Sequence, residues 1–191
     1  MATTTSANAG SLGFRHADPR YPPLWERRAQ PAARWHGAGD GPVQYLADTP
    51  DGAWAEFLRH EEITDPEDLP TIRRALWAVT LPNLTFATPT LPLDVLQGDQ
   101  TSYPECQAEA TRLRNAGAPG LTAPSAALQR GGAAGWQVER GVKQAPARDG
   151  LVVVLFGAQP SLTCWCTAIG YPASGLLAQV RHFNGTQTVS P

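Results

Sequence analysis

The sequence predicts an α+β fold with a central mixed or antiparallel sheet of short strands and a few helices. Helical segments lie early in the chain and strand-like segments cluster late, a distribution typical of this class. The strongest strand is 151–156, LVVVLF, which is apolar at every position and so is expected to be buried on both faces. Prolines at 82, 89 and 92 keep any strands between 82 and 96 short or at the sheet edge.

Two helices are marked by their terminal residues. Thr49 is a suitable N-cap and Pro50 fits the first helical position, so a helix is predicted from here to about His60. The run Ser-Tyr-Pro-Glu at 102–105 has the form of a capping box, and Asn-Ala-Gly at 115–117 has that of a helix C-terminus. A second helix is therefore predicted between them.

One carboxylate of the first helix has an ambiguous position. On a helical wheel Ala53, Trp54, Phe57 and Leu58 share an apolar arc, and Glu56 falls just outside it. A carboxylate there suits either a surface residue with a buried stem or a catalytic group. Position alone favours the surface interpretation.

The remaining segments are predicted from turn and strand signals. Residues 34–46 are expected to form a hairpin around a glycine-rich turn, 14–26 an extended arm packed by its aromatics, and 130–149 a long loop. Residues 1–12 are expected to be a disordered tail, which leaves 13–191 as a single domain. Further strands are expected over 75–81, 120–125, 163–169 and 176–183.

The composition suits a globular chain without a global basic field. Hydrophobic residues make up 42% and charged residues 17%, which excludes a disordered protein, and the net charge of −2 does not indicate binding to nucleic acid. The charge is uneven: residues 14–36 carry +3 and residues 48–68 carry −7. Solvated faces of opposite sign explain this, as would an arginine-rich segment lining the site of an anionic ligand.

The cysteines and apolar runs bear on localisation. Three cysteines do not form a disulfide framework, and Cys164 and Cys166 are expected to be buried on a strand rather than to bind zinc. No signal peptide and no run long enough to cross a membrane is evident. A cytoplasmic protein is expected.

Common catalytic motifs are missing from the sequence. It has no dinucleotide-binding glycine motif opening a helix, P-loop, zinc-protease helix or nucleophile elbow, and its four histidines lack metal-ligand spacing. The polar residues that remain are Arg34, Tyr45, Glu56 and, far downstream, Ser125. Arg34 is followed by Trp35, and a spacing of 11 residues separates Arg34 from Tyr45 and Tyr45 from Glu56.

This ordered set resembles the RES domain family, which is named for its Arg, Glu and Ser. The resemblance covers about residues 14–157 and includes Arg15 as the early arginine. His36 stands where the family commonly has Asn after the Arg-Trp pair. Ala127 and Leu128 stand where an arginine often follows the Pro-Ser-Ala run, here residues 124–126. The proline-rich stretch 82–104 and the chain after 157 are not explained by the family.

The resemblance implies a fold like that of ADP-ribosyltransferases and an activity on NAD+, with NAD+ as substrate and no separate cofactor or metal. Such proteins are usually the toxin of a toxin–antitoxin pair and consume NAD+ by hydrolysis, phosphorolysis or ADP-ribosyl transfer. The expected partners are therefore NAD+ and a helix-turn-helix antitoxin, with homodimerisation left open. No direct contact with nucleic acid or membrane is expected.

The residue types suit this chemistry. Cleavage of the nicotinamide–ribose bond passes through an oxocarbenium-like state, which a carboxylate such as Glu56 can stabilise. Arg34 first and Arg15 second are the candidates to bind the diphosphate. Tyr45 can stack on nicotinamide or ribose and aim its hydroxyl, and Ser125 can hold an amide or hydroxyl without acting as nucleophile.

Each assignment has an ordinary alternative. Arg34 could pair with an acid of the segment 48–68, Tyr45 could be a core residue, and Ser125 could be a turn residue after a proline. Two other functions stay open. One is a module that binds NAD+ or ADP-ribose without cleaving it, and the other is a mono-ADP-ribosyltransferase that modifies a protein.

Overall fold

A computed structural model of the chain describes residues 5–6, 11–24 and 29–183. Its centre is a six-stranded sheet in the order β10-β4-β2-β3-β9-β6, in which every neighbouring pair is antiparallel. The predicted α+β class is confirmed. The six strands are β2 (Leu12–Ala17), β3 (Val43–Ala47), β4 (Arg74–Thr80), β6 (Gly120–Pro124), β9 (Leu151–Phe156) and β10 (Cys164–Gly170).

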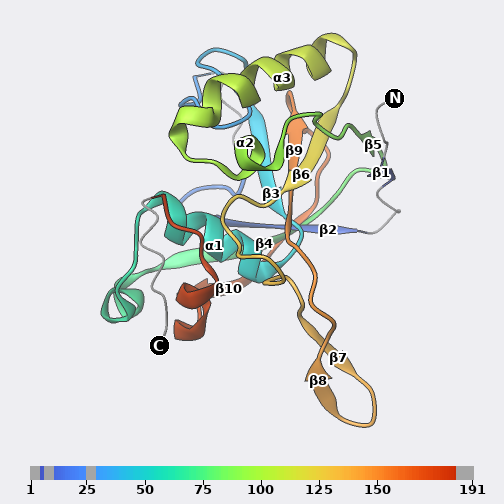
Figure 1. The fold of residues 1–191 in the computed structure, drawn as a ribbon. Helices are drawn as coiled ribbons and strands as arrows, with labels where there is room; N and C mark the ends of the chain where they lie inside the picture. Colours follow the sequence, from blue (N-terminus) through green and yellow to red (C-terminus); the bar gives the residue numbers. More distant parts are fainter. Residues whose placement is uncertain (1–4, 7–10, 25–28, 184–191) are drawn as a thin grey trace.

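The sheet divides between β2 and β3. These two strands share one register pair, Phe14 with Ala47, whereas β2 pairs with β4 over six residues. Figure 1 shows the consequence: β3, β9 and β6 run upright, and β2 and β4 lie across them. A gap in backbone pairing at this point leaves space for side chains between the two halves of the sheet.

Helices cover both halves. α1 (Pro50–His60) packs on β2 and β3, and α2 (Leu93–Gln97) and α3 (Tyr103–Asn115) pack on β6 (Figure 1). Thr49 caps α1 as predicted, because its side chain accepts a hydrogen bond from the Gly52 N–H at 3.0 Å. The shorter elements are β1 (Thr5–Ser6), β5 (Thr85–Phe86), β7 (Trp136–Val138), β8 (Val142–Gln144) and the 3-10 helices η1 (Pro66–Thr71), η2 (Gln100–Ser102) and η3 (Ser174–Gln179).

The core consists of three apolar clusters that hold these layers together. One joins α1 to η3 and to the turn after β6 through Leu58, Leu128 and Leu176. A second joins α2 and α3 to β3, β6 and β9, and the third lies between β3, β9 and the end of β4. The predicted strand 151–156 is β9, and its residues 152–155 are buried.

Several predicted segments are wrong, for reasons of tertiary pairing. Residues 34–46 do not form a hairpin: 33–36 form a separate turn closed by an Ala33–His36 bridge, and β3 pairs with distant β9 instead. The expected extended arm begins inside the sheet as β2, while residues 25–28 lie outside the described chain.

The later segments also differ from expectation. Residues 130–149 contain the β7–β8 hairpin, and 174–179 form η3 rather than part of a strand. Leu176 of η3 and Val180, which follows η3 in an extended conformation and bridges to Leu128, are both buried in the cluster formed with α1. The prediction that Cys164 and Cys166 are both buried is wrong: Cys164 is half-buried and Cys166 is exposed, because β10 is an edge strand whose residues 165–169 are exposed. Of the predicted tail, Thr5–Ser6 form β1 and Leu12 opens β2, and residues 1–4 and 7–10 lie outside the described chain.

The second helix matches its predicted ends, but its predicted cap is wrong. α3 begins at Tyr103 and is followed by Gly117 at φ 82°, a left-handed position that suits glycine. Ser102 has helical backbone angles and makes no capping bond to α3. Its hydroxyl donates to the Asp99 carbonyl and accepts from Arg34 instead, so this serine serves the site described next.

Candidate active site

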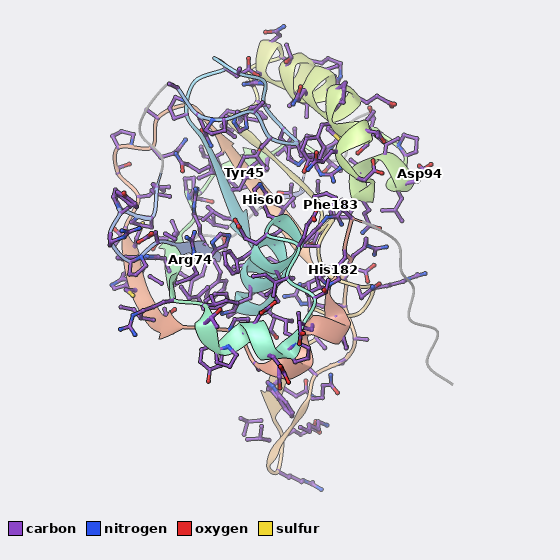
Figure 2. All side chains as sticks on the ribbon, turned by 90° about the vertical axis from the view of Figure 1, so that its left-hand side faces the viewer. Tyr45, His60, Arg74, Asp94, His182 and Phe183 are labelled. Carbon is purple, nitrogen blue, oxygen red and sulfur yellow. The ribbon has the colours of Figure 1, made fainter. Side chains whose placement is uncertain are left out.

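A cavity of about 540 Å³ opens where β2 and β3 diverge. That volume is within the range of small-molecule and cofactor sites. In Figure 2, Tyr45 and His60 lie between Arg74 on one side and Phe183 on the other, and all four line the cavity. Four of the five site residues predicted from sequence also line it: Arg15 from β2, Arg34 from the turn 33–36, Tyr45 from β3 and Glu56 from α1.

Ser125, the fifth, lies directly behind Glu56. Its neighbours Pro124 and Ala126 line the cavity, and Ser125 itself is 3% exposed. The Ser125 hydroxyl accepts hydrogen bonds from the backbone N–H groups of Ala127 and Leu128 at 3.2 and 3.1 Å. Its single proton is donated to Glu56 Oε1 at 3.2 Å. The turn after β6 therefore fixes the direction in which the hydroxyl points, and the hydroxyl fixes the carboxylate.

Glu56 is not the surface residue that its helical position favoured. Burial raises the pKa of its carboxyl, and the charges of Arg59 and Arg34 and the hydrogen bond from Ser125 act against that rise. The reason is that α1 lies against the sheet at its dividing line, so the edge of its apolar face borders the cavity rather than bulk water. A carboxylate held by one donor and desolvated in a cavity is suited to interact with a developing positive charge.

Arg34 is 8% exposed and is held by residues of the proline-rich stretch 82–104. Its Nη2 donates to the Gly98 carbonyl at 2.6 Å, and its Nη1 donates to the Val95 carbonyl at 3.2 Å and to Ser102 Oγ at 3.0 Å. The guanidinium carbon lies 4.8 Å from the centroid of the Tyr103 ring. Among the residues that the structure describes, Arg34 makes no ion pair with a carboxylate, so the expected alternative of an acid from 48–68 is wrong. Its charge is not neutralised by a direct partner.

Arg59 was missed by the sequence analysis. It is 4% exposed, and its guanidinium donates to three carbonyls: Ala126, Arg181 at 3.0 Å and Gly98 at 2.6 Å. Burial lowers its pKa and the nearby Glu56 charge raises it. The available signal was its spacing: Arg59 is one helical turn after Glu56 and therefore shares its side of α1.

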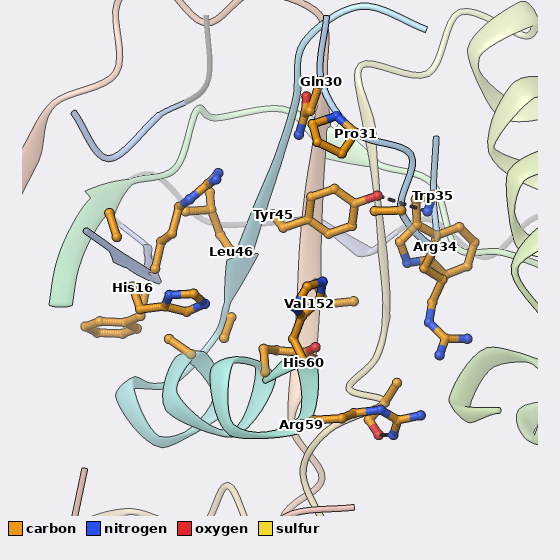
Figure 3. A pocket seen from close by; sticks show the side chains of 18 of the residues that line it. His16, Gln30, Pro31, Arg34, Trp35, Tyr45, Leu46, Arg59, His60 and Val152 are labelled. Carbon is orange, nitrogen blue, oxygen red and sulfur yellow. Dashed lines mark hydrogen bonds between the residues drawn. The ribbon is translucent and has the colours of Figure 1, made fainter. Parts of the chain in front are cut away.

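The Gly98 carbonyl is thus shared by two arginines. A Cβ at this position would lie 2.8 Å from the Asp94 carbonyl oxygen and 2.9 Å from Ser102 Oγ, so only glycine fits without displacement. The carbonyl places the guanidinium groups of Arg34 and Arg59 together at one end of the cavity (Figure 3). The stretch 82–104 therefore has a role in the site, since it orients both cations.

The ring of Tyr45 lines the cavity, and its hydroxyl is bonded to two other residues of the cavity wall. The hydroxyl accepts from the Trp35 N–H at 2.9 Å, shown by the dashed line in Figure 3, and lies 2.8 Å from His36 Nδ1. His36 Nε2 is 2.8 Å from the Pro31 carbonyl, which can only accept, so Nδ1 accepts the tyrosine proton. Burial raises the pKa of Tyr45 and lowers that of His36, so both stay neutral.

The opposite end of the cavity is formed by β2 and β4. Arg15 donates to Gln44 Oε1 at 3.0 Å, and burial lowers the pKa of its guanidinium to about 10, which keeps it charged at neutral pH. Next to it, burial and the charges of Arg74 and Arg15 lower the pKa of His16 to about 3. Neutral His16 accepts from Arg74 Nη2 through Nδ1, over 3.1 Å.

Two features expected of other functional classes are not found in the described part of the chain. No group of three or more His, Cys, Asp or Glu residues there is placed to hold a metal ion. None of the helices described has the length and apolar character needed to cross a membrane.

The chain is similar to known proteins in sequence and in fold. The family model of the RES domain matches residues 12–161. Toxin Res of Pseudomonas putida strain KT2440 is 46% identical over 74 residues, which cover 39% of this chain and 47% of that protein, so the match spans about half of that relative. A chain in the crystal structure of the M. tuberculosis MbcT–MbcA toxin–antitoxin complex superposes with a TM-score of 0.62 at 17% identity, over 92% of this chain and 90% of that one, which shows a shared fold. Because the family model covers most of its length, the chain belongs to the RES domain family.

Proposed function

We propose that the protein is an NAD+-consuming enzyme that cleaves the nicotinamide–ribose bond, as a glycohydrolase or a phosphorylase, and that it is the toxin of a toxin–antitoxin pair. The observation that carries the proposal is the placement of Glu56. Its carboxylate is fixed by Ser125 in a cavity that also holds Arg34, Arg59 and Arg15. A carboxylate among arginines suits a substrate that carries both a sugar cation in the transition state and a diphosphate.

Glu56 is assigned the reacting sugar. As the bond between nicotinamide and ribose breaks, its electron pair goes to the nicotinamide nitrogen and positive charge develops on the ribose. A carboxylate beside the ribose binds a hydroxyl in the ground state and stabilises the cation in the transition state. Because Ser125 donates to one carboxylate oxygen, the other oxygen remains available to the ribose.

The diphosphate is assigned to the end of the cavity that holds Arg34 and Arg59. Arg34 and Arg59 are buried, and neither makes an ion pair with a carboxylate among the residues described. Their bonds to backbone carbonyls fix the planar groups in place and leave further N–H groups of each guanidinium for an anion. In this assignment the ring face of Tyr45 packs on the nicotinamide, and Arg15 lies at the end of the cavity opposite Arg34 and Arg59.

The toxin role and the partner rest on the relatives. One relative is called Toxin Res, and a neighbour in fold was crystallised in a toxin–antitoxin complex. An activity that consumes NAD+ in the cytoplasm requires control, and an antitoxin made from an adjacent gene would supply it.

Nicotinamide release tests the chemistry. The purified protein is mixed with NAD+, alone and with phosphate or arsenate, and nicotinamide is followed by chromatography. Release without phosphate indicates a glycohydrolase, and release that depends on phosphate or arsenate indicates a phosphorylase. If label from NAD+ becomes covalently bound to cellular protein, the enzyme is a mono-ADP-ribosyltransferase. Binding of NAD+ without any release from folded protein would refute the enzymatic proposal and favour a binding module.

A further inference from the structure

The C-terminal strap, residues 174–183, lies beyond the part of the chain that the family model matches, yet it is firmly attached near the cavity. Leu176 and Val180 are buried against α1 and the turn after β6. The backbone N–H of Gln129 donates to the Gln179 carbonyl at 2.7 Å, and that of Arg181 donates to the Ala127 carbonyl at 2.6 Å. The strap is therefore held to the same turn that carries Ser125.

The strap brings an aromatic ring to the cavity wall. Arg59 donates to the Arg181 carbonyl at 3.0 Å, and two residues later the half-buried Phe183 lines the cavity. The Arg59 guanidinium carbon lies 4.4 Å from the centroid of the Phe183 ring. Figure 2 shows Phe183 on the opposite side of Tyr45 from Arg74, and its contact with Arg59 puts it at the end of the cavity that holds Arg34 and Arg59.

Two arginine–aromatic pairs therefore meet at this end. Arg34 stacks on Tyr103 and Arg59 stacks on Phe183, and one carbonyl, that of Gly98, binds both arginines. Planar bases bind to such surfaces, because aromatic rings and guanidinium groups both stack on a π face. Tyr103 and Phe183 both line the cavity at this end.

The order of groups in the substrate decides which base this end receives. In the proposed function, on which the adenine assignment rests, Glu56 meets the nicotinamide ribose and Arg34 and Arg59 meet the diphosphate. Along NAD+ the next group beyond the diphosphate is adenosine, and along the cavity wall the next group beyond Arg59 is the ring of Phe183. We propose that Phe183 is the stacking platform for adenine, so that the C-terminal strap supplies the adenosine subsite.

The test compares ligands that do and do not carry adenine. Competitive inhibition of NAD+ turnover is measured with ADP-ribose, which contains adenine, and with nicotinamide mononucleotide, which lacks it. For Phe183→Ala and Phe183→Leu we expect KM for NAD+ and the inhibition constant of ADP-ribose to rise by roughly 5- to 150-fold, the range for loss of one stacked base. The inhibition constant of nicotinamide mononucleotide is expected to stay the same. Phe183→Tyr, which keeps an aromatic face, should restore both values.

Two controls separate stacking from damage to the fold. Phe183→Leu keeps apolar bulk against Arg59, so it should melt like the wild-type protein while showing the binding defect. Tyr171→Ala removes a 54% exposed aromatic residue that does not line the cavity, and should change nothing. Equal weakening of both inhibitors, or unchanged ADP-ribose binding in Phe183→Ala, would overturn the adenine assignment alone. A wild-type protein that neither binds nor cleaves NAD+ would overturn the proposed function, and this inference with it.

Discussion

Glu56→Gln tests the charge at the centre of the site. The amide has nearly the same volume as the carboxylate and keeps an oxygen that can accept the Ser125 hydroxyl proton. Arg59 and Arg34 keep their carbonyl partners, since neither is bonded to Glu56 directly. The substitution thus removes one negative charge with little change in shape.

The expected loss is large because the charge is preorganised. Removing one electrostatic group aimed at a developing charge typically lowers kcat by about 10²–10³, or roughly 2.7–4 kcal/mol of transition-state stabilisation. Glu56 is desolvated and held by a donor whose own lone pairs are filled, which places it in that regime. We expect kcat for nicotinamide release to fall by about this factor while KM changes much less.

The same substitution should leave the fold as stable as before or more so. Because burial raises the pKa of Glu56 above its unfolded value, the carboxyl contributes most to stability at acid pH, below the unfolded pKa. That contribution is lost as the pH rises through the folded pKa. The advantage of Glu56→Gln in urea unfolding should therefore be greater at neutral pH than in acid.

Glu67→Gln is the matched control, since Glu67 is an exposed glutamate of η1 away from the cavity. It should leave both turnover and stability unchanged. Turnover in Glu56→Gln within a factor of a few of wild type would refute the charge-stabilisation role. A marked loss of stability at neutral pH would refute the argument that desolvation dominates the energetics of this carboxyl.

Three further outcomes are expected. Ser125→Ala removes a donor that lowers the pKa of Glu56, so the acid limb of the pH–rate profile should move to higher pH. The same change leaves the buried N–H groups of Ala127 and Leu128 without their acceptor, so the free energy of unfolding measured in urea should fall by about 1–3 kcal/mol. Gly98→Ala places a Cβ 2.8 Å from a backbone oxygen, so KM for NAD+ should rise as Arg34 and Arg59 shift. The control Gly175→Ala, at a position with open space around it, should leave KM unchanged. Equal KM values in the two variants would show that the Gly98 carbonyl does not orient the two arginines. Tyr45→Phe should lower the free energy of unfolding by about 1–3 kcal/mol and leave kcat nearly unchanged, because the hydroxyl bonds the turn 33–36 and the ring lines the cavity; a large loss of kcat at full stability would assign the hydroxyl to catalysis.

The sequence determined the local elements and the identity of the principal residues. The Thr49–Pro50 signal placed α1, the apolar run 151–156 placed β9, and the spacing of Arg34, Tyr45, Glu56 and Ser125 indicated the family. These signals are encoded by neighbouring residues or by order along the chain, and they do not depend on how distant segments meet.

The tertiary structure decided what each residue contacts. The sequence could not predict that β3 would pair with β9 rather than with residues near Arg34, because backbone hydrogen bonds between distant strands leave no local pattern. For the same reason Arg59 had the features of an ordinary helix residue until Gly98, Ala126 and Arg181 supplied its carbonyl partners.

Two side chains illustrate the physical reason. No signal in the sequence indicated that the Tyr45 hydroxyl would bond Trp35 and His36, which it does because a buried backbone N–H and a neutral imidazole both need a partner. Phe183 had no local signal at all, since its position depends on Val180 docking beside α1. Sequence order thus determined which groups are present, and the requirement to satisfy buried polar atoms and apolar surface at long range determined where they point.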